Sequence, residues 1–134
     1  MPELDISAAA DDVVRLLQQR QAPQAAARYE ALRSGQSQVV REALDRYVLA
    51  RAPAELAALR EDEANGPAVT RMLDRVRTAS RPPRMPTNDE TRGLSQAQQY
   101  DVYASVIAMR GEAAARDALL TQDRVILGLR NENR

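Results

Sequence analysis

The sequence predicts an all-α fold, a small bundle of six to seven helices with a long Pro-rich loop. Apolar residues recur every three or four positions. Ala, the residue with the best helix propensity, is abundant, and Pro and Gly separate the periodic segments. These breaks divide the chain into an N-terminal helical bundle over 1–79, a Pro-rich loop or linker over 80–94, and a C-terminal helical segment over 95–134.

The first predicted helix covers residues 7–21. Ser7 is its expected N-cap, because a short side-chain oxygen there accepts from an orphan backbone N–H. Pro23 begins the second helix, since a missing N–H is harmless in the first turn. Tyr29 and Leu32 share one face of that helix. Gly35 ends it, because glycine takes the left-handed conformation freely.

The third predicted helix has the most continuous apolar stripe and follows Ser37 as N-cap. Glu42 and Arg46 form an expected i,i+4 pair on its other side. Pro53 begins a fourth helix over 53–64, and a fifth covers 67–79. The expected core residues of the third and fifth helices are Val39, Val40, Ala43, Leu44, Tyr47, Val48, Val69, Met72, Leu73 and Val76.

Residues 80–93, SRPPRMPTNDETRG, show no helical period and predict a long loop. Ser95 and Gln98 then form a predicted capping box for a sixth helix. This helix is apolar over a wide arc, which joins the stripe of Tyr100, Tyr103 and Ile107 to that of Val102, Val106 and Met109. Residues 112–120 are expected to be helical, and 125–129, VILGL, stay open between helix and strand.

The composition excludes much chemistry. The chain has no Cys, His, Trp or Phe, and Arg supplies all 19 of its basic residues. Without His or Cys there is no ordinary zinc, haem, iron–sulfur or thiol site, and no Ser-His-Asp or Cys-His nucleophile. We therefore expect no enzyme, no cofactor and no small-molecule substrate. An enzyme using only carboxylates and Tyr is the remote alternative.

The acidic residues do not predict a metal site. Glu61, Asp62 and Glu63 are consecutive, so on a helix their side chains diverge around the axis, whereas a metal needs converging ligands. A solvated helix end explains them. Pairs such as Asp11 with Asp12 are expected at the surface or near a helix N-terminus.

The chain is expected to lie in the cytoplasm without contact to a membrane. Its first residues, MPELDIS, carry acids where a signal peptide has a basic stretch and then an apolar run. No apolar run approaches the roughly 18 residues of a membrane span.

The apolar core is expected to be thin, which favours a partner. Leu, Ile and Val make up about a fifth of the chain, near the lower limit for globular proteins. Ala forms helices readily but buries little area. We therefore expect a protein partner or a homo-oligomer to supply part of the stability.

One stretch is strongly basic in an otherwise neutral chain, with 19 basic and 19 acidic residues overall. Asp74 is its only acid, and its five arginines are Arg71, Arg75, Arg77, Arg81 and Arg84. Such a stretch suits phosphates or an acidic partner, although a solvated face paired with acids elsewhere is the plainer interpretation. Tyr100 and Tyr103 are further candidate contacts, because Tyr is enriched at interfaces. For Tyr100 and Tyr103, packing in the core is the alternative.

The stretch SQVVREALDRYV, residues 37–48, resembles the second helix of ribbon-helix-helix DNA-binding proteins, and PQAAARYEAL, residues 23–32, looks like their first helix. That resemblance implies a DNA-reading strand at 16–22, with Gln19 and Gln21 as the base-reading candidates. The leading expectation is a non-enzymatic helical interaction protein: an assembly component, adaptor, chaperone or antitoxin-type partner. A DNA-binding regulator of the ribbon-helix-helix kind is the alternative.

Overall fold

The computed structural model describes residues 3–79 and 85–110, and it confirms the all-α fold. Over these residues it has seven helical segments and no strand. They are α1 (Ile6–Gln18), α2 (Ala22–Arg33), α3 (Gln38–Arg51), α4 (Pro53–Arg60), α5 (Pro67–Thr78), α6 (Asn88–Thr91) and the helical residues 96–110. The predicted segments 112–120 and 125–129 lie outside the described residues.

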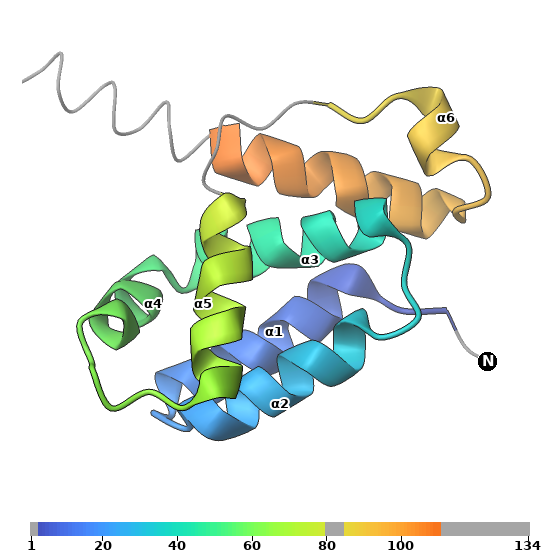
Figure 1. The fold of residues 1–134 in the computed structure, drawn as a ribbon. Helices are drawn as coiled ribbons and strands as arrows, with labels where there is room; N and C mark the ends of the chain where they lie inside the picture. Colours follow the sequence, from blue (N-terminus) through green and yellow to red (C-terminus); the bar gives the residue numbers. More distant parts are fainter. Residues whose placement is uncertain (1–2, 80–84, 111–134) are drawn as a thin grey trace, which may run out of the picture.

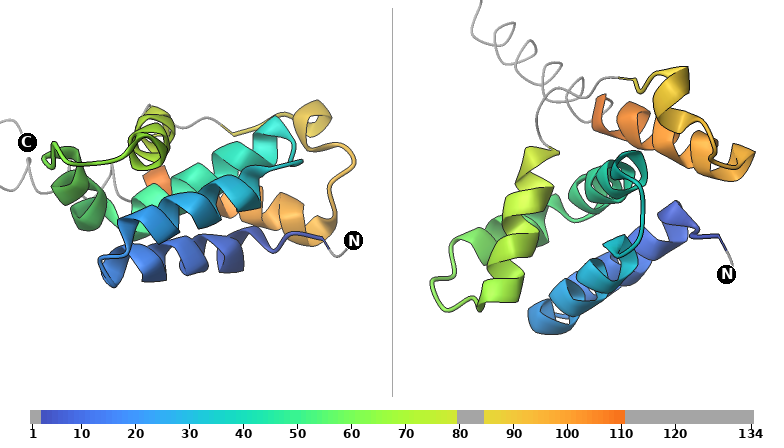
Figure 2. Two further views of the ribbon diagram at one scale, coloured as in Figure 1. Left: turned by 60° about the horizontal axis from the view of Figure 1, so that its bottom comes forward. Right: turned by 45° about the vertical axis from the view of Figure 1, so that its right-hand side comes forward.

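The third helix, α3, is the centre of the fold (Figure 1). It packs against α1, α2, α4 and α5. The helical residues 96–110 lie alongside α3 (Figures 1 and 2), and they also bond to Leu4 and to Ser7 at the start of α1. The predicted stripes of α3 and α5 are both buried, from Val39 to Val48 and from Val69 to Val76. Val102 and Met109 belong to the same core, so residues 96–110 share it with α1–α5.

The ends of α1 differ from the prediction. Asp5, not Ser7, is the N-cap, and its side chain accepts from the backbone N–H of Ala8 at 3.1 Å. The helix ends at Gln18, because Arg20 takes a left-handed φ of 59°. The N–H groups of Arg20 and Gln21 donate to the carbonyls of Leu17 and Leu16, which is the Schellman pattern.

The second turn follows the prediction, since α2 ends at Arg33 and Gly35 has a φ of 76°. The end of α4 does not: it lies at Arg60 rather than at residue 64. Asp62 accepts from the N–H of Ala64 at 2.9 Å, and Asn65 donates to the carbonyl of Leu59 at 2.6 Å. These side chains replace the helical bonds of the last predicted turn.

The predicted loop over 80–93 contains the short helix α6. Thr87 and Glu90 cap it reciprocally, each side chain bonded to the other's backbone N–H. The predicted box at Ser95 is only half formed. Ser95 accepts from the N–H of Gln98 at 3.1 Å, but the Gln98 side chain donates to the carbonyl of Leu4 instead.

Candidate protein interface

The helix over residues 96–110 has one face on the bundle and one face outward. Val102, Val106 and Met109 are buried against the other helices, and so are Gln98 and Ser105. The opposite side leaves Tyr100 72% exposed and Ile107 59% exposed. Of the two apolar stripes predicted for this helix, the one carrying Val102 therefore joins the core. The stripe carrying Tyr100 faces away from it.

Polar contacts fix the orientation of this helix. Arg46 of α3 donates from Nε to Ser105 Oγ at 2.9 Å, and Ser105 donates to the carbonyl of Val102 at 2.7 Å. Asp101 accepts from the backbone N–H of Ser7 at 3.4 Å. If Ser105 moved away, the buried guanidinium of Arg46 would lose a hydrogen bond that water cannot replace. Rotation of the helix would break these bonds, so the exposure of Tyr100 and Ile107 is a fixed property of the fold.

Small residues complete the outward face. Ala97 and Ala108 are exposed, and Tyr103 and Ala104 are partly exposed. We call Ala97, Tyr100, Ile107 and Ala108 the outer stripe. Their spacing of three, seven and one places them along one side of a helix. Tyr100 and Ile107 are the two large apolar residues exposed on this side of the helix, and two such residues on one face favour a contact surface over a solvated face.

Three of the five arginines singled out in the sequence lie on α5, namely Arg71, Arg75 and Arg77. Arg71 and Arg77 of α5 are exposed, and Arg77 lies at a pocket described below. Arg75 pairs with Glu30 of α2. This hydrogen bond lowers the pKa of the Glu30 carboxyl below its ordinary value and raises that of the guanidinium. Arg81 and Arg84 lie outside the described residues.

The tyrosines divide into two kinds. Tyr29 is fully buried and donates from its hydroxyl to Asp45 at 2.6 Å, so its hydroxyl does not reach the surface. Tyr47 is also buried, and the Arg51 guanidinium lies 4.4 Å from the centre of its ring. Burial raises the pKa of the Tyr47 hydroxyl to about 12. Tyr100 is exposed and Tyr103 is partly exposed, so these two tyrosine side chains are accessible from outside the bundle.

A buried polar cluster joins α2 to α3, and the sequence analysis missed it. Arg33 donates to Asp45 at 2.5 Å, and its guanidinium lies 5.1 Å from the centre of the Tyr29 ring. Burial raises the pKa of the Asp45 carboxyl, while the bonds from Tyr29 and Arg33 oppose that rise. Tyr29 and Arg33 stand at i and i+4, which is the only local signal of this cluster. Every member is bonded to another, so the cluster holds the fold together and is not open to a ligand.

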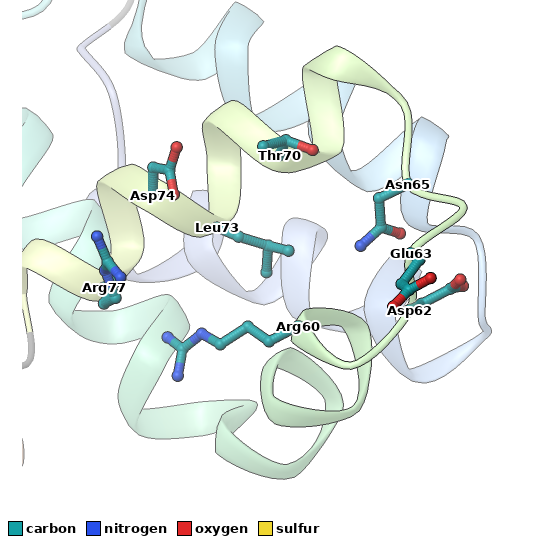
Figure 3. Close-up of a pocket in the computed structure, with 8 residues that line it drawn as sticks. All are labelled: Arg60, Asp62, Glu63, Asn65, Thr70, Leu73, Asp74 and Arg77. Atoms are coloured by element: carbon teal, nitrogen blue, oxygen red, sulfur yellow. The ribbon is translucent and has the colours of Figure 1, made fainter.

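One shallow pocket, of about 230 Å³, lies beside α5 and the turn after α4 (Figure 3). Its polar side chains are largely committed to their own backbone: Asn65 bonds to Leu59, Asp62 to Ala64 and Thr70 to Gly66. Its lining residues are Arg60, Asp62, Glu63, Asn65, Thr70, Leu73, Asp74 and Arg77. Mixed charges around a small, open hollow do not indicate a binding site.

Within the part of the chain that the structure describes, no three acidic side chains come together as a metal site. No helix among those residues is long and apolar enough to cross a membrane. Residues 16–22, where the ribbon-helix-helix resemblance implies a strand, form the last turn of α1, the turn at Gln19 and Arg20, and the start of α2. Comparison with protein families, with curated proteins and with solved structures finds no match to this chain.

Proposed function

We propose that this chain is a non-enzymatic helical interaction protein that acts within a complex and docks a protein on its outer stripe. The supporting observation is the exposure of Tyr100 and Ile107 on a helix whose other face is held by buried polar bonds. Covering a large apolar side chain contributes about 1.5–3 kcal/mol. A rigid, preformed helix also loses little conformational entropy on binding.

A protein suits this face better than a nucleic acid. The outer stripe carries no charge, whereas binding to duplex DNA is driven by phosphate contacts from basic side chains. The ribbon-helix-helix alternative depends on a strand at 16–22, and these residues are helix and turn. Arg71 and Arg77 are exposed on α5, and we assign them to a second, polar contact with an acidic partner.

The test uses the full chain purified through an affinity tag from its native host, with the molar mass measured by light scattering. In the variant, Tyr100→Glu and Ile107→Glu place two carboxylates on the outer stripe. The matched control, Ala57→Glu with Ala58→Glu, adds the same charge at exposed positions of α4. We expect the associated protein to be lost from the variant and kept by the control, with equal helicity by circular dichroism.

Equal recovery from both proteins would refute docking on the outer stripe. The ratio of absorbance at 260 nm to that at 280 nm separates the two functions in the same sample. A nucleic acid that co-purifies, and that leaves with rising salt, would favour the DNA-binding alternative.

A further inference from the structure

Two exposed arginines lie where α5 packs against α2, and we call Arg71 and Arg75 the basic pair. They stand four residues apart, which places them about 6 Å apart along one side of α5. Glu30 of α2 forms an ion pair with Arg75. The hydrogen bond from Arg75 lowers the pKa of the Glu30 carboxyl, and the charges of Arg33 and Arg71 lower it further. The same carboxylate therefore lies near both arginines of the basic pair.

The residues of α2 around Glu30 leave the basic pair open to solvent. Ala27, one turn before Glu30, is small and exposed, and so is Ser34, which follows the end of α2. Arg33 is long, but it turns inward and donates to the buried Asp45. A group from another molecule can therefore approach the basic pair over the flank of α2.

The ion pair between Glu30 and Arg75 is one that a second carboxylate can replace. The Arg75 side chain is 42% exposed and the Glu30 side chain 34% exposed. An ion pair so accessible to water contributes little net stability, because both groups are also well solvated when apart. A carboxylate that displaces Glu30 therefore has little to overcome.

We propose that the basic pair binds an acidic segment of a partner protein, and that Glu30 occupies Arg75 until that segment binds. The inference rests on the proposed function, because it specifies the residues and the ligand chemistry of the polar contact on α5. The structure already shows a carboxylate bound at Arg75. Each planar guanidinium suits a carboxylate, and two carboxylates one turn apart on a partner helix match the spacing of the basic pair.

A nucleic acid suits this surface less well. Asp74 is exposed on α5 between the two arginines in sequence, and Glu30 faces them from α2. Nucleic acids bind through an array of phosphate contacts to basic side chains, and carboxylates beside such contacts repel the phosphates. The chain has 19 basic and 19 acidic residues, so its net charge provides no long-range attraction either.

The probe is a fluorescent peptide of about 20 residues, long enough to form a helix, with Glu at every fourth position and Ala elsewhere. Fluorescence anisotropy measures its binding to the full chain at low salt, where screening is weakest. We expect it to bind about tenfold more tightly than the same peptide with Gln in place of Glu, since each exposed ion pair contributes a factor of about three.

Arg71→Gln combined with Arg75→Gln should weaken binding of the Glu peptide about tenfold, for the same reason. The matched control is Arg15→Gln combined with Arg28→Gln. It removes two exposed arginines that pair with Asp12, and should leave the affinity within about twofold of the wild type. Both variants should keep the helicity of the wild type by circular dichroism. Equal binding of the Glu and Gln peptides, or equal affinity of both variants, would overturn the acidic contact.

Glu30→Gln tests the role of Glu30 and leaves the basic pair intact. The affinity for the Glu peptide should rise about threefold, because no carboxylate of the chain then competes for Arg75. Asp12→Asn is the matched control, since it also removes an acid that pairs with exposed arginines, and should leave the affinity unchanged. The same rise in both variants would reflect net charge alone and would overturn the role of Glu30.

Two further arms separate this contact from the alternatives. A labelled DNA duplex that binds more tightly than the Glu peptide, and that the loss of the basic pair releases, would overturn the acidic segment in favour of a nucleic acid. The variant with Tyr100→Glu and Ile107→Glu retains the basic pair, so it should bind the Glu peptide like the wild type. Docking on the outer stripe and binding at the basic pair can therefore fail separately.

Discussion

Leu44 anchors the centre of the bundle, and its truncation is the sharpest test of the core. The side chain is fully buried in α3, the helix that packs against α1, α2, α4 and α5. Leu44→Ala removes the equivalent of about three methylene groups, worth about 2.4 kcal/mol, and leaves a cavity. With the cavity included, we expect a loss of about 3 kcal/mol in the free energy of unfolding.

Urea unfolding followed by circular dichroism at 222 nm measures this loss. A chain of this size has a urea slope of about 1.5 kcal/mol per molar, so the midpoint should fall by about 2 M while the slope stays constant. Leu59→Ala is the matched control. Leu59 is only partly buried at the edge of the core, and less than half of that effect is expected. A midpoint shift below about 0.5 M for Leu44→Ala would show that the centre of the core lies elsewhere.

Three further predictions concern individual contacts. The folded pKa of Asp45 lies above its ordinary 3.8, so its contribution to stability is present below pH 3.8 and is lost as the pH rises through the folded pKa. A carbon NMR titration of the Asp45 carboxyl should show the raised pKa. Arg33→Met should raise this pKa further, because the guanidinium lowers it. Arg20→Gly should stabilise the fold by about 0.5–1 kcal/mol, because glycine takes the left-handed φ without strain; an unchanged urea midpoint would contradict this. Ser105→Ala leaves the Arg46 Nε bond without its acceptor and should cost about 1–3 kcal/mol in urea unfolding, and wild-type stability would mean that this bond does not hold the helix.

The existence of most helices could be predicted from the sequence, because their signals are local. Apolar residues with a period of 3.6 show within a few turns which face of a helix will be buried. The stripes of α3 and α5 are buried as predicted. Gly35 likewise takes the left-handed φ expected of it. The helix α6 had a local signal too, the Thr87 and Glu90 box, but its four residues are too short to show an apolar period.

Tertiary contacts decided the caps and the partners of the polar side chains. The sequence made Ser7 a natural N-cap, but its hydroxyl accepts from Arg51 at 2.7 Å, across 44 positions of the chain, and Asp5 caps α1 instead. Arg46 forms the predicted i,i+4 pair with Glu42, at 4.0 Å. Its side chain is nevertheless buried, and its Nε donates to Ser105, 59 positions away. Such partners are set by which helices meet, and no local pattern contains that information.

The candidate interface shows the same division. The sequence determined that residues 96–110 form a helix with two adjoining apolar stripes, because spacing alone establishes both. It did not determine which stripe faces the bundle, since burying either removes apolar area from water. In the tertiary structure, the hydrogen bonds available to the polar side chains decided which stripe is buried. Gln98 and Ser105 lie beside Val102 and find partners in Leu4 and Arg46, so that face turns inward and Tyr100 and Ile107 are left outside.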